Sequence, residues 1–304
     1  ITGHQSAIEL AGDAPEVVAD ALKMKKTGND ILKAVGGRSV HPVNACVGGF
    51  YSFPDKAKFT ALLPDLEWGL EKAIAYTKWA VTLAYPELDI SDYEYVSLYN
   101  KDQYAILDGD IKSSKIGTIT ANDFEENYLE KHVKHSNALH SLTKDGDPYM
   151  VGPLARYNNN AEQFLPFVKE LITELGIEPP ITNPYKQLIT RMVETVEIYQ
   201  RAIDLINAYD PKGEPHLILD LKAGEGAAAS EAPRGLLYHR YAINDKGMIK
   251  TARIVPPTAQ NLARMEADLW KLVPQVMDMP NDEATLECEH LIRSYDPCIS
   301  CATH

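Results

Sequence analysis

The sequence predicts a mainly α fold with small β-hairpin elements. Apolar residues recur with helical spacing over most of the 304 residues, whereas alternation of apolar and polar residues is confined to short runs. Glycine, proline and asparagine separate these runs. No internal repeat, low-complexity stretch or linker-like segment interrupts the chain, so we expect residues 1–304 to form a single domain.

The first part of the chain predicts two helical regions around one loop. Residues 15–35 have helical apolar spacing, start at a proline and are followed by Gly36 and Gly37, which would end the helix. Residues 41–50 contain one proline and two glycines and are expected to form a structured loop. Residues 54–85 are expected to form one or two helices, interrupted near Pro64.

The middle of the chain predicts two short strands and two helices. Residues 93–99 and 103–107 alternate apolar and polar side chains and carry aromatic residues, which favours strands. Residues 161–175 and 184–209 return to helical spacing. In the second of these helices we expect four charged residues to be exposed and five apolar residues to be buried: Glu194, Glu197, Arg201 and Asp204, and Leu188, Met192, Val196, Ile203 and Ile206.

The last third predicts three strands and two helices. The strands are expected at residues 217–221, 236–243 and 248–255. Residues 244–247, Asn-Asp-Lys-Gly, supply the turn of a hairpin between the last two. Residues 258–277 and 282–295 have helical spacing, and Asp296-Pro297 would stop the final helix.

Composition excludes several classes of partner. A formal net charge of −13 and a pI near 5.2 disfavour nucleic acid and anionic membranes, which need clustered basic residues. No apolar run approaches the roughly 20 residues of a membrane span. The four cysteines are too few and too unevenly spaced for a secreted disulfide framework, which favours a reducing compartment, the cytoplasm.

Two of the thiols have the spacing of a metal-binding pair. Cys298 and Cys301 are separated by two residues, so both sulfurs can lie on one side of a turn. A redox dithiol, half of a zinc site and two unremarkable cysteines are alternatives, and spacing does not choose between zinc, iron and nickel. Cys46 and Cys288 lie elsewhere in the sequence and are expected to be small buried apolar residues.

Two other unusual segments have simple interpretations. The glycine- and alanine-rich run from Gly224 to Gly235 ends with a single arginine before a predicted strand, where it could cradle a ligand or be a plain connecting loop. It lacks the pattern of a nucleotide-binding glycine loop. His132, His135 and His140 alternate with lysines and are interpreted as a solvated helix face rather than a metal site.

Residues Asp296–His304, DPCISCATH, resemble the C-terminal signature of the large subunits of nickel-iron hydrogenases. Four further segments agree with that family in order: residues 36–50, 150–156, 230–235 and 257–261. The resemblance is closer to the soluble multimeric enzymes that couple dihydrogen to NAD(P), including the sulfhydrogenases, than to membrane-bound uptake enzymes. It implies the large multi-helix fold of a hydrogenase large subunit.

The resemblance implies a nickel-iron centre with carbon monoxide and cyanide on iron. Nickel would be held by four cysteine thiolates, of which Cys298 resembles the terminal ligand and Cys301 the ligand that bridges nickel and iron. Arg234 resembles the arginine that overhangs the open metal position. Ala232 and Pro233 would line the diatomic ligands of iron.

The resemblance also implies supporting roles around the metals. Pro257 and Thr258 would contact the cofactor, Thr258 through a hydrogen bond to a cyanide. Asp296 matches the aspartate beside the arginine, and His304 resembles the ligand of a structural magnesium ion. His304 is also the residue after which the family's maturation protease cuts, so a mature C-terminus is expected.

The activity implied is reversible heterolytic cleavage of dihydrogen, with Cys298 or a base near Arg234 accepting the proton. Electrons would leave through iron-sulfur clusters of a small subunit to diaphorase subunits that bind FAD and NAD(P). A maturation protease and a nickel chaperone are further implied partners.

The family's N-terminal CxxC, its proton-relay glutamate and a carboxylate magnesium ligand have no match in these residues, so these groups are expected from an N-terminal portion not represented here. The alternatives are a non-catalytic relative, similar to the quinone-binding subunit of respiratory complex I, and an immature apo subunit.

Overall fold

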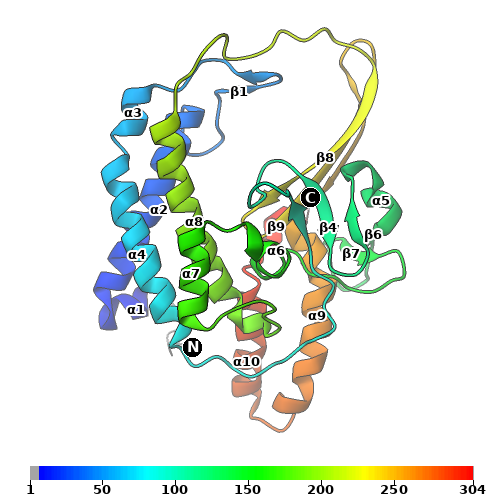
Figure 1. Cartoon of the computed structure of the whole chain (residues 1–304). Coiled ribbons are helices and arrows are strands. Elements are labelled where there is room, and N and C mark those ends of the chain that lie inside the picture. The colour runs from blue at the N-terminus through cyan, green and yellow to red at the C-terminus, as the bar shows by residue number, and fades with distance from the viewer. Residues whose placement is uncertain (1–6, 304) are drawn as a thin grey trace. The chain divides into compact units, whose positions relative to one another are not determined.

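The computed structural model describes residues 7–303, and the chain divides into two compact units (Figure 1). Unit 1 comprises residues 1–84 and 192–220, and unit 2 comprises residues 85–191 and 221–304. Helices make up 48% of the chain and strands 17%, which confirms the mainly α fold. The assignment of residues 1–304 to a single domain stays a prediction.

Unit 1 is built from helices. They are α1 (Ala7–Asp13), α2 (Pro15–Gly36), α3 (Lys56–Thr60), α4 (Leu63–Val81) and the part of α8 (Gln187–Ala208) that begins at Met192. α2 confirms the predicted helix, including its first proline and its end, where Gly37 adopts a left-handed conformation with φ 84°. The predicted break near Pro64 is the junction of α3 and α4.

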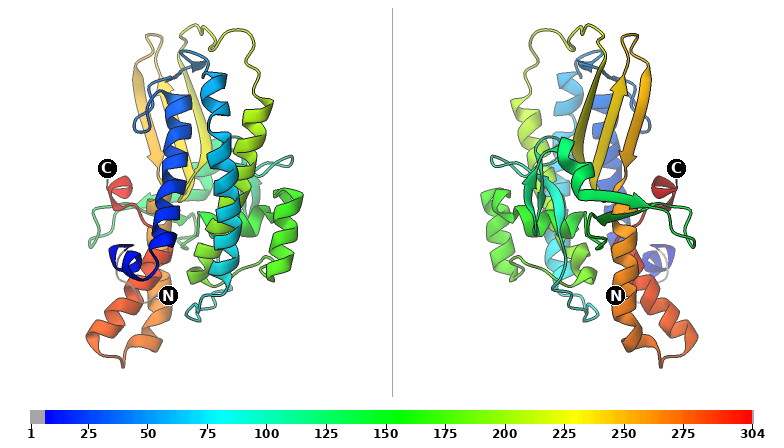
Figure 2. Two further views of the ribbon diagram at one scale, coloured as in Figure 1. Left: turned by 90° about the vertical axis from the view of Figure 1, so that its left-hand side faces the viewer. Right: turned by 90° about the vertical axis from the view of Figure 1, so that its right-hand side faces the viewer.

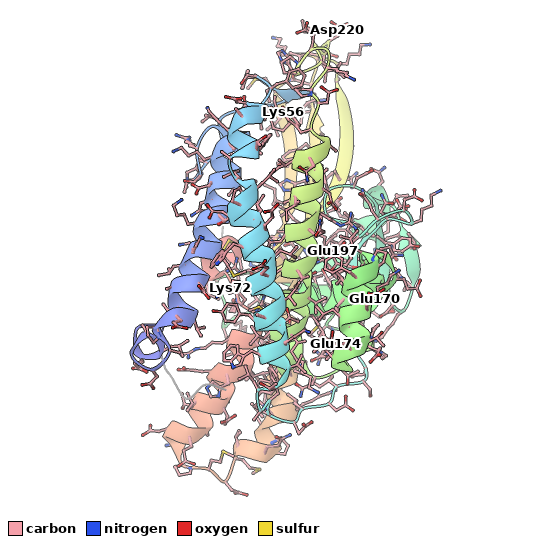
Figure 3. The ribbon with its side chains drawn as sticks, turned by 60° about the vertical axis from the view of Figure 1, so that its left-hand side comes forward. Lys56, Lys72, Glu170, Glu174, Glu197 and Asp220 are labelled. Atoms are coloured by element: carbon pink, nitrogen blue, oxygen red, sulfur yellow. A yellow bond between two sulfur atoms is a disulfide. The ribbon has the colours of Figure 1, made fainter. Side chains whose placement is uncertain are left out.

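The core of unit 1 lies between α2, α3, α4 and α8. Phe59, Leu66, Ile203 and Ile206 are buried there, and apolar residues of α2 pack against them. Two ion pairs join α2 to α4: Lys72 Nζ lies 2.7 Å from Asp20, and Lys23 Nζ lies 3.1 Å from Asp65. Figure 3 labels Lys72 on α4.

The structure corrects the predicted exposure of two glutamates on α8. Glu194 and Glu197 are both buried, although helical spacing places them between apolar positions (Glu197 is labelled in Figure 3). Glu197 Oε1 accepts a hydrogen bond from Arg201 Nε at 2.5 Å, an i,i+4 pair that neutralises its charge. A charge can therefore occupy an inner helix position when its partner lies one turn away.

The loop regions of unit 1 differ in part from expectation. Residues 41–50 contain a two-stranded hairpin of β1 (Ala45–Cys46) and β2 (Gly49–Phe50). The predicted strand at residues 217–221 is wrong, because this apolar run joins no ladder and its side chains are largely exposed. Hydrophobic alternation alone does not make a strand without a neighbouring strand to accept its hydrogen bonds.

Unit 2 contains three antiparallel sheets (Figure 2). One has the order β3-β4-β5, formed by Val96–Tyr99, Asp110–Ser113 and Gly117–Ile119. The second pairs β6 (Tyr128–Lys131) with β7 (His140–Thr143). The third is a long ribbon with the order β10-β9-β8, formed by Ile249–Val255, Gly235–Ile243 and Gly224–Ala232.

These sheets confirm some predicted strands and correct others. Residues 93–99 overlap β3, and the predicted hairpin is β9-β10, whose turn is Asn244–Gly247. The predicted strand at 103–107 is wrong, since this segment forms a loop before β4. The run from Gly224 is not a connecting loop but strand β8, which pairs with β9 along its whole length.

The helices of unit 2 surround a core of aromatic and aliphatic residues. They are α5 (Phe124–Asn127), α6 (Pro153–Asn160), α7 (Pro166–Leu175), the start of α8, α9 (Pro257–Val276), α10 (Asn281–Ser294) and α11 (Ile299–Ala302). The helices predicted over 258–277 and 282–295 are confirmed as α9 and α10, and the helix predicted over 161–175 is confirmed only from Pro166. The core includes Val96, Leu98, Tyr149, Leu236 and Tyr238.

No helix in the described part of the chain combines the length and the apolar character that crossing a bilayer requires.

Candidate active site

Arg234 sits in the tight turn that joins β8 to β9. Ala232 ends β8, Gly235 begins β9, and only Pro233 and Arg234 lie between them. Because Ala232 pairs with Gly235 in the antiparallel register, the turn has two residues and little freedom. The family signature in this segment therefore holds its arginine at a fixed point on the rim of the sheet.

A buried arginine fixes the carbonyl groups of this turn. Arg156 on α6 donates from Nη1 to the Ala232 carbonyl at 3.0 Å and from Nη2 to the Pro233 carbonyl at 3.1 Å. Its Nη1 also lies 2.8 Å from Glu231 Oε2, and both side chains are 5% exposed or less. A planar guanidinium that holds two consecutive carbonyls sets the direction in which the next residue, Arg234, leaves the chain.

Two glycines allow the turn to approach α6. Gly152, at the N-cap of α6, has φ 107°, and Gly235 has φ 136°. A Cβ on Gly235 would lie 2.7 Å from the Gly152 nitrogen, and a Cβ on Gly152 would lie 2.8 Å from the Arg234 carbonyl oxygen. Both positions therefore combine a conformation that favours glycine with backbone contact.

We expect Gly235→Ala to destabilise the protein by at least about 2 kcal/mol, because backbone strain costs about 1–3 kcal/mol and overpacking about as much again. Urea unfolding measures the loss. Gly117→Ala is the matched control, since Gly117 has φ 85° but nothing within 4 Å of its Cβ position and so reports strain alone. Equal losses in the two variants would show that the contact between Gly235 and Gly152 is unimportant.

Arg234 reaches the segment that carries the cysteine pair. Its Nη2 lies 3.1 Å from Asp296 Oδ2, and its Nε donates to the Asp296 carbonyl oxygen. Asp296 has φ 51°, a left-handed conformation that aspartate tolerates better than most residues, and it turns the chain at the end of α10. The guanidinium thus grips side chain and backbone of one residue, two positions before Cys298.

Cys298 and Cys301 flank the short helix α11. Cys298 is its N-cap and is half-buried, whereas Cys301 is exposed. The two residues form a disulfide, with their Cα atoms 5.3 Å apart. Their sulfurs therefore lie together as the spacing predicts, and reduction to thiolates is required before both can bind a metal.

The start of α9 holds Cys298 and the neighbouring strands in place. The Cys298 N–H donates to Thr258 Oγ1 at 3.1 Å. Gln260 Nε2 donates to the Val255 and Leu236 carbonyls, and Asn261 makes both backbone hydrogen bonds of Val151, at 2.9 and 3.1 Å. Three polar residues of one helical turn thus link Cys298, β9, β10 and the segment before α6.

A buried carboxylate anchors the end of α10. Asp268 on α9 is completely buried and accepts hydrogen bonds from Arg264 at 2.8 Å, from the Tyr93 hydroxyl at 2.5 Å and from the Tyr295 hydroxyl. Burial raises the pKa of the Asp268 carboxyl, while Arg264 and the two hydroxyls oppose this rise. Tyr295 directly precedes Asp296, so this network positions the turn that Arg234 grips.

We expect Asp268→Asn to lower the free energy of unfolding by about 3–5 kcal/mol, because it leaves the buried Arg264 without its counter-charge. Asp278→Asn is the control, since Asp278 is an exposed residue just beyond α9, and it should change stability by less than about 0.5 kcal/mol. Thermal unfolding of both variants measures the difference. A loss below about 1 kcal/mol for Asp268→Asn would contradict the anchoring role.

The structure brings most of the predicted site residues together. Contacts through Arg234, Asp296 and Thr258 link the turn after Ala232, the start of α9 at Pro257 and the cysteine segment. His304 lies outside the described residues. Sequence reasoning did not identify Arg156, Gln260 or Asn261 as supports, although all three lie in the quoted family segments. A polar residue inside a short signature is the signal that could have found them.

Two predictions about other cysteines and histidines are corrected. Cys46 and Cys288 are partly exposed rather than buried, on the β1-β2 hairpin and on α10. His132, His135 and His140 do not lie on a helix, because residues 128–131 and 140–143 form the β6-β7 hairpin. His140 is buried, and His135 contacts Glu266 of α9.

The donor set at Cys298 fits a soft transition metal in part. Two sulfurs lie together beside a guanidinium, and small residues, Ala232 and Pro233, leave the turn free of bulky side chains. Among residues 7–303, no third histidine, cysteine or carboxylate joins the pair in a metal-binding cluster. The described residues thus supply two thiolate ligands, and further ligands must come from outside them.

The profile of the family described as "Nickel-dependent hydrogenase" matches residues 85–304. The alpha subunit of sulfhydrogenase 1 from Pyrococcus furiosus is 30% identical over 305 residues, which cover 99% of this chain and 71% of that protein. One of the subunits of the F420-non-reducing hydrogenase from Methanothermobacter marburgensis is 29% identical over 325 residues, covering 99% of this chain and 68% of its own.

Among solved structures, an NAD+-reducing [NiFe]-hydrogenase in the H2-reduced state superposes with a TM-score of 0.84 at 20% identity. The match covers all of this chain and 73% of that one. This likeness concerns the fold.

Proposed function

Because the chain belongs to the nickel-dependent hydrogenase family, we propose that it is the catalytic large subunit of a nickel-iron hydrogenase that cleaves dihydrogen reversibly into protons and electrons. The observation that carries the proposal is the contact of Arg234 with Asp296, two residues before a pair of adjacent sulfurs. A fixed cation beside two potential thiolates is a suitable environment for separating charge.

We propose that Cys298 and Cys301 hold nickel, with Cys301 also bound to an iron that carries carbon monoxide and cyanide. When bound, this centre would supply a redox-active Lewis acid that polarises dihydrogen. Ala232, Pro233, Pro257 and Thr258 would surround the iron ligands. The Thr258 hydroxyl accepts the Cys298 N–H, so its own hydrogen remains available to donate to a cyanide.

The chain's own residues would then handle the proton. Cys298 Sγ is a candidate acceptor, because a thiolate held against the N-terminus of α11 and near a guanidinium is stabilised in its charged form. Arg234 keeps a positive charge at neutral pH and stabilises negative charge that develops beside it. Asp296 is a positioning residue, since it holds the guanidinium through two contacts.

Other components are proposed from the relatives. Both of the relatives described above are named as subunits, so we propose a small subunit with iron-sulfur clusters and diaphorase subunits with FAD and NAD(P). A maturation protease and a nickel chaperone would assemble the site, His304 would bind magnesium, and the complex would act in the cytoplasm.

Hydrogen-dependent reduction of a viologen dye by the purified complex tests the activity, and NAD, NADP and a deazaflavin are then compared as physiological acceptors. We expect dye reduction under hydrogen and none under argon. Reduction of the dye with none of the three acceptors would retain the hydrogenase and refute the NAD(P) linkage. Absence of dye reduction by a nickel-loaded complex would refute the activity itself.

A further inference from the structure

A cluster of two imidazoles and one carboxylate lies in unit 2, outside the cysteine segment. His135 belongs to the loop between β6 and β7, His140 begins β7, and Glu266 lies on α9. One ligand atom from each residue falls within 4.8 Å of the others, and it is the only such group of three among the residues the structure describes. The cluster joins a hairpin to a helix that is distant in sequence.

The geometry of the cluster is close to that of a tetrahedral metal site. His135 Nε2 lies 2.6 Å from Glu266 Oε1, and His140 Nε2 lies 3.7 Å from the same oxygen. Ligands that bind zinc at about 2.0–2.1 Å in tetrahedral geometry are about 3.3 Å apart. One distance must therefore lengthen and the other shorten by less than an ångström, which two partly exposed side chains can accommodate.

The positions of the three side chains differ in a useful way. His140 is 4% exposed and fixed by strand pairing with Lys131, whereas His135 is 63% and Glu266 43% exposed. A rigid buried ligand with two adjustable outer ones leaves the remaining coordination position to water. The imidazole rings meet edge to face with centroids 5.7 Å apart, so both ring nitrogens can face one point.

We propose that His135, His140 and Glu266 form a binding site for a divalent transition-metal ion, with zinc as the reference ion. Two imidazoles and one carboxylate favour zinc over magnesium or calcium, which prefer oxygen ligands alone. The ion would fasten the β6-β7 loop to α9, the helix that also carries Thr258 and Asp268. The site is structural in character and does not depend on the hydrogenase proposal.

Zinc bound by the purified protein is measured by competition with a chromogenic chelator. We compare wild type, His135→Ala and Glu266→Gln with His132→Ala, which removes an exposed histidine of the same loop from outside the cluster. The difference in bound zinc between variants is independent of any zinc held by cysteines. Magnesium replaces zinc in a parallel titration.

We expect His135→Ala and Glu266→Gln each to weaken one zinc site by about tenfold or more, since even the loss of a supporting contact costs 10–100-fold at metal sites. His132→Ala should bind like wild type, and magnesium should not compete. Both altered residues are exposed enough that the fold should persist, which circular dichroism checks. Equal zinc affinity and stoichiometry in all four proteins would overturn the proposal and leave a histidine–glutamate ion pair.

Discussion

Replacement of Cys298 or Cys301 by serine is expected to strip nickel from the protein and to abolish hydrogen-dependent dye reduction. A serine hydroxyl is a hard ligand that is hardly ionised at neutral pH, whereas a thiolate binds nickel strongly. We expect nickel content to fall by at least about tenfold, because changes to supporting residues alone cost 10–100-fold. Metal analysis of the purified complex measures the loss.

The matched control for this experiment is Cys288→Ser, on α10, because it removes a partly exposed thiol that lies outside the pair. It should retain both nickel and activity. Since Cys298 and Cys301 form a disulfide in the structure, the proteins are prepared under reducing conditions. Nickel at wild-type level in both altered proteins would refute the ligand assignment.

Arg234→Lys is expected to lower turnover about 10²–10³-fold while leaving metal content unchanged. Loss of one preorganised donor at a charged reaction site costs about this much. Lysine keeps the charge but not the planar fork that contacts both the carboxylate and the carbonyl of Asp296. Hydrogen–deuterium exchange, which needs no partner protein to accept electrons, separates the cleavage step from electron transfer.

Arg240→Lys is the control for Arg234, because Arg240 lies on the strand that follows the Arg234 turn and pairs with Glu125 and Glu225 at the surface. We expect at most a twofold effect, as for most surface ion pairs. If Arg234→Lys instead loses nickel, the arginine supports assembly of the site. If it keeps both nickel and turnover, Arg234 has no part in the reaction.

Much of the helical fold could be predicted because its signals are local. α2 begins at a proline and ends at Gly37, and the amphipathic spacing of α9 and α10 persists over several turns. β8 could not be predicted in this way, because glycine and alanine have low strand propensity. It is a strand because β9 pairs with it along its length, which is a tertiary contact.

The candidate site divides along the same line. Family signatures indicated Arg234, Asp296, Thr258 and the cysteines, but they gave no information about which atoms touch. The role of Arg156 follows from two carbonyl groups about 76 residues away in sequence. The cluster at His140 was misinterpreted because its carboxylate partner, Glu266, comes from a helix that the local sequence does not reveal.

Infrared spectroscopy combined with nickel and iron analysis of the purified complex tests the central claim most directly. The account predicts about one nickel and one iron per large subunit beyond the iron of partner proteins, with carbon monoxide and cyanide bands that vanish in Cys301→Ser. A mature complex that contains neither nickel nor these bands would contradict it and would leave the chain as a non-catalytic member of the family.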